Sequence, residues 1–115
     1  MDLQANTSTD CTVITVRETR IDAACAIQFK DRMRELCKEA AERVILDLGR
    51  VDFIDSSGLG AIVASMKMLA PERVLELANP SPKVTKVLRL TRMDSVFTIH
   101  EDFASVEPLA SRLAG

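Results

Sequence analysis

The 115-residue sequence is poor in the residue types on which several classes of protein depend. It contains no tryptophan and no tyrosine, so its four phenylalanines are the only aromatic residues that could stack on bases. Its 15 basic and 17 acidic residues give a formal net charge of −2, and no overall positive field attracts a polyanion. The composition therefore argues against a nucleic-acid partner.

Histidine and cysteine are too few and too scattered for the common metal sites. His100 is the only histidine, so no second imidazole is available for a catalytic or metal-binding cluster. The three cysteines, Cys11, Cys25 and Cys37, are odd in number and form no Cys-x-x-Cys pair. This spacing argues against both a disulfide framework and a zinc site, and it predicts reduced, mostly buried thiols. We expect neither a metal nor a cofactor bound by this chain.

Long apolar runs are also missing. Residues 1–10 contain neither a basic segment followed by an apolar one nor a stretch long enough to span a bilayer. The sequence therefore predicts no targeting segment, no membrane partner and a cytoplasmic location. The chain length and the 47% content of hydrophobic residues fit one domain, residues 1–115, with an ordinary core.

Apolar patterning predicts strands and helices that alternate along the chain. Segments 3–9 and 12–17 suggest an opening hairpin, and the second segment is rich in β-branched residues. A helix is expected after Asp22, its candidate N-cap, because apolar residues then repeat at helical spacing. Further strands and helices are expected at 44–48, 59–69, 74–78, 82–91, 96–100 and from Ser105 to the end.

This order of elements predicts an α/β fold. Strands that alternate with helices favour parallel pairing through helical crossovers, whereas the opening hairpin adds an antiparallel edge strand. We therefore expect a mixed sheet of about four or five strands, accompanied by about four helices.

The most informative stretch joins a buried strand to an amphipathic helix. Segment 44–48 is a short apolar run, typical of a strand buried on both faces. Asp55-Ser56-Ser57-Gly58-Leu59-Gly60 follows, dense in small polar residues and glycine. Apolar residues then repeat at helical spacing: Leu59, Ile62, Val63, Met66 and Leu69. The serine pair is thus predicted at a helix N-terminus, where unpaired N–H groups and the helix dipole favour a negative group.

Segment 53–60, placed after a buried strand and before an amphipathic helix, resembles the signature of the bacterial anti-sigma factor antagonists, a family of STAS domains. The resemblance implies the STAS fold over nearly the whole chain. It also implies regulatory phosphorylation of the first serine after the aspartate, which is Ser56, with Ser57 as the fallback. The implied partner-binding residues are Asp22, Asp55, Ser56, Ser57, Gly58, Leu59 and Gly60.

Two other segments carry weaker parts of the resemblance. Thr19-Arg20-Ile21-Asp22 keeps the apolar residue and the aspartate of a Gly-Glu-Leu-Asp-like turn before the first helix of the family, but it replaces the Gly-Glu pair. Asp22 is therefore either part of a partner surface near Ser56 or only a helix cap. Ser81-Pro82 resembles the beginning of the third helix of the family, since serine can cap a helix and proline suits its first position.

The resemblance implies a non-enzymatic, partner-switching protein. In its unmodified state it would bind an anti-sigma factor that is also a GHKL-type serine kinase, and would so free the sigma factor. The kinase would supply ATP and Mg²⁺. Phosphorylation of Ser56 would release the complex, and a PP2C-type phosphatase would restore the binding form.

Two enzymatic interpretations fail on spacing. A serine hydrolase needs a glycine two residues before its nucleophile, a place held here by Ile54 or Asp55. A nucleotide-binding P-loop needs a lysine after its last glycine, whereas Ala61 follows Gly60. One alternative stays open, a STAS module of a larger regulatory or ligand-sensing assembly without a sigma-factor output, because fold alone does not separate the two.

Overall fold

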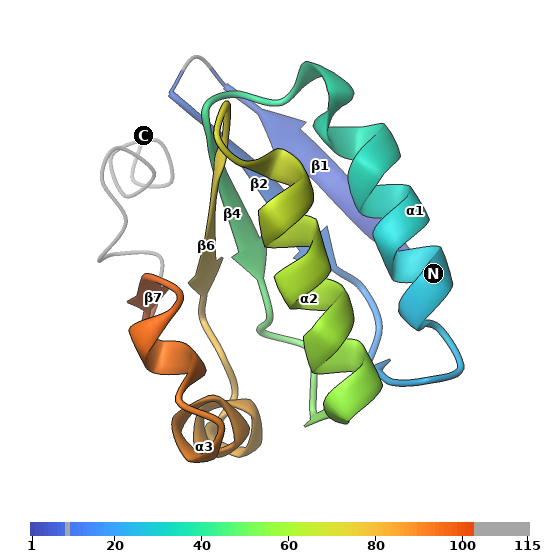
Figure 1. Ribbon diagram of the computed structural model, residues 1–115, viewed down its shortest axis with the longest axis vertical. Helices are drawn as coiled ribbons and strands as arrows, with labels where there is room; N and C mark the ends of the chain where they lie inside the picture. Colours follow the sequence, from blue (N-terminus) through green and yellow to red (C-terminus); the bar gives the residue numbers. More distant parts are fainter. Residues whose placement is uncertain (9, 103–115) are drawn as a thin grey trace.

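The structure is a computed structural model that describes residues 1–8 and 10–102. Figure 1 shows one central sheet with helices α1 and α2 side by side on one of its faces. Five strands form this sheet in the order β1-β2-β4-β6-β7. The β1–β2 pair is antiparallel and the other pairs are parallel. The predicted mixed α/β sheet with an antiparallel hairpin is therefore confirmed.

The strands of the main sheet are β1 (Leu3–Thr7), β2 (Cys11–Val16), β4 (Arg43–Asp47), β6 (Val74–Ala78) and β7 (Ile99–His100). The last of them is shorter than the strand predicted at 96–100. The N–H groups of Val96 and Phe97 instead bond to the carbonyl of Met93, because a 3₁₀ turn precedes the strand. Two further two-residue strands, β3 (Arg20–Ile21) and β5 (Phe53–Ile54), pair in parallel outside the main sheet.

Three α-helices lie within the described residues: α1 (Ala26–Leu36), α2 (Ser56–Leu69) and α3 (Pro82–Leu90). The start of α3 agrees with its prediction, since the Ser81 hydroxyl accepts the N–H of Val84 at 3.3 Å and Pro82 is the first helical residue. The fourth helix expected from Ser105 falls outside the described residues.

The prediction that Asp22 caps α1 is wrong. The N-cap of α1 is Cys25, which makes no side-chain capping bond. Asp22 lies three residues earlier, where its Oδ1 accepts the N–H of Ala24 at 3.1 Å and so closes a local turn. A carboxylate can accept a nearby backbone N–H in a turn as readily as at a helix end. Here the carboxylate of Asp22 accepts the N–H within the turn and does not cap the helix.

The main core fills the space between the sheet and the two helices α1 and α2. Its fully buried side chains include Ile14, Val16, Phe29, Met33, Leu46, Ile62 and Leu77. On α2 the predicted apolar stripe divides: Ile62 and Leu69 are buried, whereas Leu59, Val63 and Met66 are half-buried on the flank. Complete burial of each large side chain contributes about 1.5 to 3 kcal/mol, so this packing fixes the position of α2 on the sheet.

The thiols agree with their prediction. Cys11 and Cys37 are buried, Cys25 is half-buried, and none of them forms a disulfide. Burial raises the pKa of the Cys37 thiol, as expected for a group that packs like a small apolar residue. Across residues 1–8 and 10–102, no helix is long and apolar enough to cross a membrane. The same residues hold no cluster of three metal-ligating side chains.

One edge of the sheet carries the helix N-termini. The parallel strands β2, β4 and β6 run in the same direction, and the chain after each leads into α1, α2 or α3. In Figure 1 the arrows of β4 and β6 point toward the lower edge, where α2 begins and α3 lies. The Ser81 hydroxyl donates to the carbonyl of Val51 at 2.9 Å, which ties the start of α3 to the loop before β5. Sites in open α/β sheets characteristically lie at this edge.

Candidate functional site at the start of α2

Asp55 is the last residue of the connection between β5 and α2, and it caps α2. Its backbone is extended, and its Oδ1 accepts the N–H of Gly58 at 2.8 Å. Its carbonyl accepts the N–H of Leu59 at 2.9 Å, the first bond of the helical ladder. These are the contacts of an N-cap residue, so Ser56 becomes the first residue of α2 and Ser57 the second.

The second carboxylate oxygen of Asp55 reaches a different part of the chain. Oδ2 accepts the N–H of Ala23 at 3.0 Å, in the loop between β3 and α1. The N–H of Asp55 in turn donates to the carbonyl of Ile21 at 3.3 Å. Asp55 therefore holds the loop after β3 against the first turn of α2, across 32 residues of sequence.

Asp22 belongs to the same loop, and its side chain forms an ion pair with Arg20. Nε of Arg20 donates to its Oδ2 at 3.1 Å. This bond to Arg20, with the Cys25 thiol and the Ala24 N–H, holds the pKa of Asp22 below its ordinary value. The Arg20 guanidinium also lies 4.3 Å from the centre of the Phe53 ring on β5. The structure thus brings Asp22 into the loop that Asp55 fastens to α2.

Ser56 and Ser57 are both exposed on the first turn of α2. Within the described part of the chain, no hydrogen bond engages either hydroxyl. The first turn of a helix also carries N–H groups without helical partners, and only that of Gly58 is taken by the cap. A phosphate added here would meet the positive end of the helix dipole and free donors, so the fold itself can accept the charge.

The two glycines of the motif serve different purposes. Gly58 is buried, and a Cβ at this position would collide with the carbonyl group of Ile21 on β3. Gly60 is exposed, and a Cβ there would meet nothing within 4 Å. Close packing inside the protein therefore requires Gly58, whereas Gly60 leaves open space that another molecule could approach.

Sequence reasoning missed a buried polar cluster on the face of the sheet opposite α1 and α2. Glu76 of β6, only 7% exposed, accepts two bonds from Arg43 of β4, at 2.8 and 2.9 Å. Nε2 of His100 on β7 lies 2.7 Å from the same carboxylate. The bonds from Arg43, then the contact with His100, lower the pKa of Glu76. The only sequence signal is that charged residues take the positions that alternate with the core positions of these strands.

The fold and the serine-bearing helix start can now be compared with known proteins. The family model described as "STAS domain" matches residues 2–106. BtrV of Bordetella bronchiseptica, named as a candidate anti-sigma factor antagonist, is 30% identical over 80 residues, which cover 69% of each chain. The chain belongs to the STAS domain family. Within that family it is an anti-sigma factor antagonist-like domain, in agreement with the motif.

Solved structures support the fold independently. An anti-sigma-factor antagonist (STAS) domain protein from Planctomyces limnophilus superposes with a TM-score of 0.81 at 23% identity, over 98% of this chain and 99% of that one. The anti-sigma factor antagonist SpoIIAA in its unphosphorylated form gives a TM-score of 0.70 at 22% identity, over 98% and 96% of the two chains. At these identities the likeness establishes the fold alone, and it confirms the predicted STAS fold.

Proposed function

We propose that this chain is an anti-sigma factor antagonist that works by partner switching. Its unphosphorylated form binds an anti-sigma factor that is also a GHKL-type serine kinase, and this binding frees the sigma factor. The kinase, which brings ATP and Mg²⁺, phosphorylates Ser56 and so releases the complex. A PP2C-type phosphatase resets the protein. The proposal treats residues 1–115 as one STAS domain that acts in the cytoplasm.

The observation that carries the proposal is the exposed Ser56 hydroxyl at the first position of α2. Ser57 is also exposed, so exposure alone does not choose between the two serines. The choice of Ser56 rests on the family motif, in which the serine directly after the capping aspartate takes the phosphate. In the described chain the only imidazole, that of His100, contacts Glu76 of β6, and no histidine lies at either serine. The site is therefore suited to accept a phosphate that a partner transfers.

The charge of a phosphate is large enough to drive the switch. It adds about −1.5 to −2 at pH 7, next to the carboxylate of Asp55. Both oxygens of Asp55 are bound to backbone N–H groups, so this side chain is already fixed when the phosphate arrives. Like charges placed together across an interface cost several kcal/mol, and a loss of about 3 kcal/mol weakens binding roughly a hundredfold.

The switch needs no change of fold. SpoIIAA has been solved in both its unphosphorylated and its phosphorylated form. Both structures superpose on this chain, with TM-scores of 0.70 and 0.64. This likeness supports the view that a domain of this shape tolerates a phosphate, and that the modification acts at the surface presented to the partner.

The test compares Ser56→Ala with Ser56→Asp, using a purified GHKL-type serine kinase from the same organism. Ser56→Ala keeps the surface neutral, so it should bind the kinase and stay bound when ATP is added. Ser56→Asp places a carboxylate in the first turn of α2, which suits the helix dipole but should weaken binding. Titration calorimetry measures both affinities, and melting curves show that both variants are folded.

Ser57→Ala is the matched control and should behave as the wild type, with one phosphate per chain by mass spectrometry. If Ser56→Ala still carries one phosphate per chain, the phosphorylation site is Ser57 or another residue. Equal affinity of folded Ser56→Ala and Ser56→Asp would remove the electrostatic mechanism. It would favour the alternative, a STAS module of a larger regulatory or ligand-sensing assembly.

A further inference from the structure

Helices α1 and α3 arrange their exposed charges differently. On α1, Arg34 pairs with Asp31 and Arg32 with Glu35, each at 3.3 Å and three residues apart. The segment from Ser81 to Arg92 contains four basic residues and no acidic one. Within the described residues no ion pair engages any of these four. The charge of α3 is therefore left facing outward, although the chain as a whole is slightly acidic.

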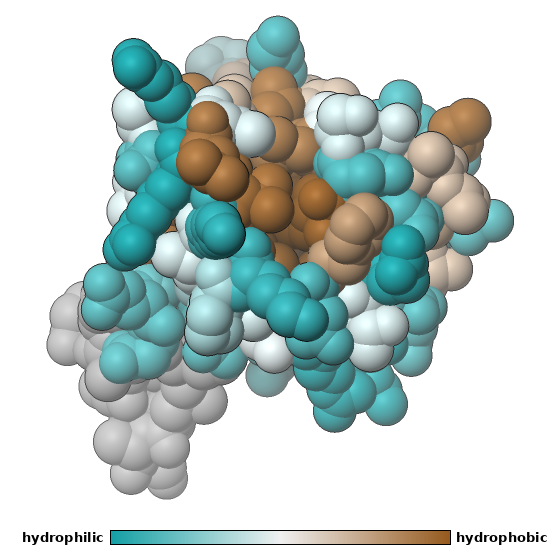
Figure 2. Space-filling model, turned by 90° about the horizontal axis from the view of Figure 1, so that it is seen from below, coloured by the Kyte–Doolittle hydropathy of each residue, from teal (hydrophilic) through white to brown (hydrophobic). Residues whose placement is uncertain are grey.

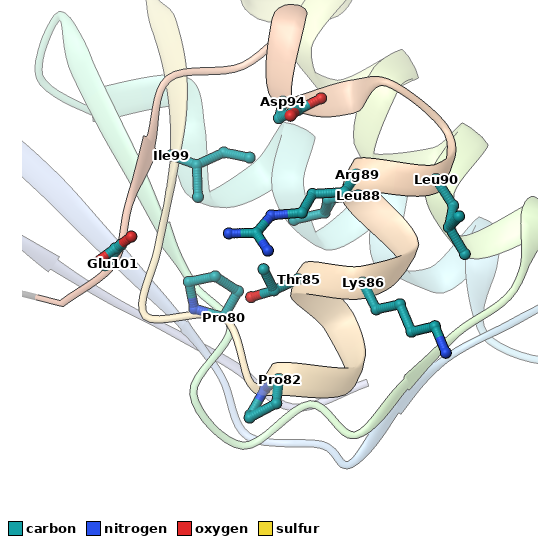
Figure 3. Close-up of a pocket in the computed structure, with 10 residues that line it drawn as sticks. All are labelled: Pro80, Pro82, Thr85, Lys86, Leu88, Arg89, Leu90, Asp94, Ile99 and Glu101. Carbon is teal, nitrogen blue, oxygen red and sulfur yellow. The ribbon is translucent and has the colours of Figure 1, made fainter.

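Two lysines of α3 share a face with apolar side chains. Lys83, Lys86, Val87 and Leu90 follow one another at helical spacing, and we call this set the α3 stripe. Leu90 is 74% exposed, the most exposed of the large hydrophobic side chains of the described chain. Figure 3 shows Lys86, Arg89 and Leu90 of α3 among the residues that line an open pocket of about 700 Å³. Among residues 1–8 and 10–102, no ion pair engages either lysine of the stripe.

The α3 stripe lies at the same edge of the sheet as Ser56. Strand β5 contacts both α2 and α3, and the bond from Ser81 to Val51 anchors the start of α3 beside it. Phe53 of β5 is 41% exposed, and Leu59 of α2 is half-buried. Figure 2 views this edge and shows an apolar area framed by hydrophilic residues. A partner that reaches Ser56 at this edge also faces α3.

We propose that the α3 stripe is the second half of the docking surface for the serine kinase, and that it receives an acidic segment carrying an apolar side chain. This inference rests on the proposed function. The exposed leucine favours a protein partner over a bare polyanion, because its burial is favourable only against apolar atoms. The lysines select carboxylates on that partner and repel bases.

The charges around Ser56 would also orient the bound kinase. Asp22, Asp52 and Asp55 lie on the side of β3 and β5, whereas the lysines lie on α3. On one side of the docking surface Asp52 and Asp55 lie beside the Arg20–Asp22 ion pair, and on the other side the lysines of the α3 stripe are not ion-paired with any described residue. A kinase surface of the opposite polarity fits it in one orientation only, which presents Ser56 to the transferred phosphate.

The experiment uses the full chain and the same kinase as above. The variants are Lys83→Glu with Lys86→Glu, and separately Leu90→Ser, which alters an exposed position. The matched control, Lys38→Glu with Lys67→Glu, makes the same change in net charge. Both control lysines are exposed, Lys38 just after α1 and Lys67 in the last turn of α2, away from Ser56. Circular dichroism confirms that every variant is folded.

Phosphorylation kinetics and calorimetry supply the readouts. We expect both α3 variants to raise KM and Kd about tenfold with kcat unchanged, and the control to stay within about twofold. Added NaCl should slow association of the wild type more than that of the lysine variant, because charge at the rim of an interface acts mainly on the association rate.

The outcomes separate this inference from the proposed function. A wild type that the kinase neither binds nor phosphorylates overturns both. A wild type that binds, with α3 variants of equal KM and Kd, overturns only the role of the α3 stripe. Binding of the wild type to phosphatidylserine vesicles or duplex DNA, abolished by the lysine substitutions, would overturn the acidic protein partner and assign the stripe to that polyanion.

Discussion

Asp55 and Glu76 both join segments that are far apart in the sequence, but their partners and surroundings differ. Asp55 is half-buried and accepts two neutral backbone N–H groups, those of Gly58 and Ala23. Glu76 is buried in the opposite face of the sheet, and its partners are the guanidinium of Arg43 and the imidazole of His100. One carboxylate orders a loop, and the other connects β4, β6 and β7.

This difference suggests that the carboxylate beside the proposed phosphorylation site and the carboxylate that stabilises the sheet have separate roles. The donors that Asp55 accepts are neutral N–H groups, so these contacts depend less on charge than the ion pair of Glu76 does. The guanidinium of Arg43 is itself charged, so its attraction to Glu76 depends on the charge of that buried carboxylate. A phosphate can therefore change the electrostatics around Asp55 while the charged cluster that holds the strands stays intact.

Replacement of Glu76 should have the largest effect. Glu76→Gln keeps the shape of the side chain but removes the negative charge that Arg43 and His100 contact, and we expect the free energy of unfolding to fall by about 3 kcal/mol. Urea denaturation measures the loss. The control is Glu42→Gln, at an exposed position one residue before β4, which should change stability by less than about 0.5 kcal/mol. Equal losses for both would remove the distinction between buried and exposed carboxylates.

The same variant gives a pH dependence. The pKa of Glu76 in the folded protein is lower than its ordinary value of 4.5, mainly because of the bonds from Arg43. Its stabilising contribution is therefore complete above pH 4.5 and is lost as the pH falls through the lowered folded pKa. The stability difference between the wild type and Glu76→Gln should shrink in that acid range, as followed by urea titrations at successive pH values. A constant difference would contradict this assignment.

A methyl group at the two glycines of α2 should act with opposite signs. Gly58→Ala forces a Cβ against the carbonyl of Ile21, so we expect a loss of about 1 to 3 kcal/mol. Gly60→Ala meets open space and replaces a poor helix former, so it should stabilise by about 0.5 to 1 kcal/mol. Thermal melts compare the two variants. Similar destabilisation by both would show that backbone flexibility, and not packing against β3, requires Gly58.

The smallest losses of stability are expected at Asp55. Asp55→Ala removes both accepting oxygens and should cost about 1 kcal/mol, whereas Asp55→Asn keeps one of the two and should cost less. Hydrogen exchange should accelerate at the amides of Ala23 and Gly58 in Asp55→Ala, since both lose their acceptor. A loss in Asp55→Asn as large as that in Glu76→Gln would mean that charge matters equally at both places.

The two carboxylates also differ in how well the sequence predicts them. The start of α2 is local: a capping residue, small residues and an apolar stripe stand within one short stretch, so the sequence predicts the helix and the exposed serines. The pair of Arg43 and Glu76 spans 33 residues, and it forms only when β4 and β6 take their parallel register. The pattern within one strand does not by itself show which residue of the neighbouring strand lies beside it.

The misplaced cap at Asp22 has a related cause. The sequence offers a capping residue before an apolar pattern, but it does not show that Arg20 and the N–H of Ala24 already use the carboxylate. The shortened β7 is similar, since a 3₁₀ turn takes the N–H groups that the strand would have used. In both places, local hydrogen bonds compete with the helix cap or strand that the residue types favour, and the local hydrogen bonds form instead.

The collision that a side chain at position 58 would have with Ile21 also bears on how relatives of this chain can be sorted by sequence. Because packing inside the domain demands Gly58, a descendant that lost its kinase would still have to keep it. Gly60 is under no such demand, and only a closely approaching partner would penalise a larger residue there. Under the proposed function, position 60 read together with position 56 is thus the better marker of STAS domains that keep the proposed switch, whereas position 58 reports on packing inside the domain.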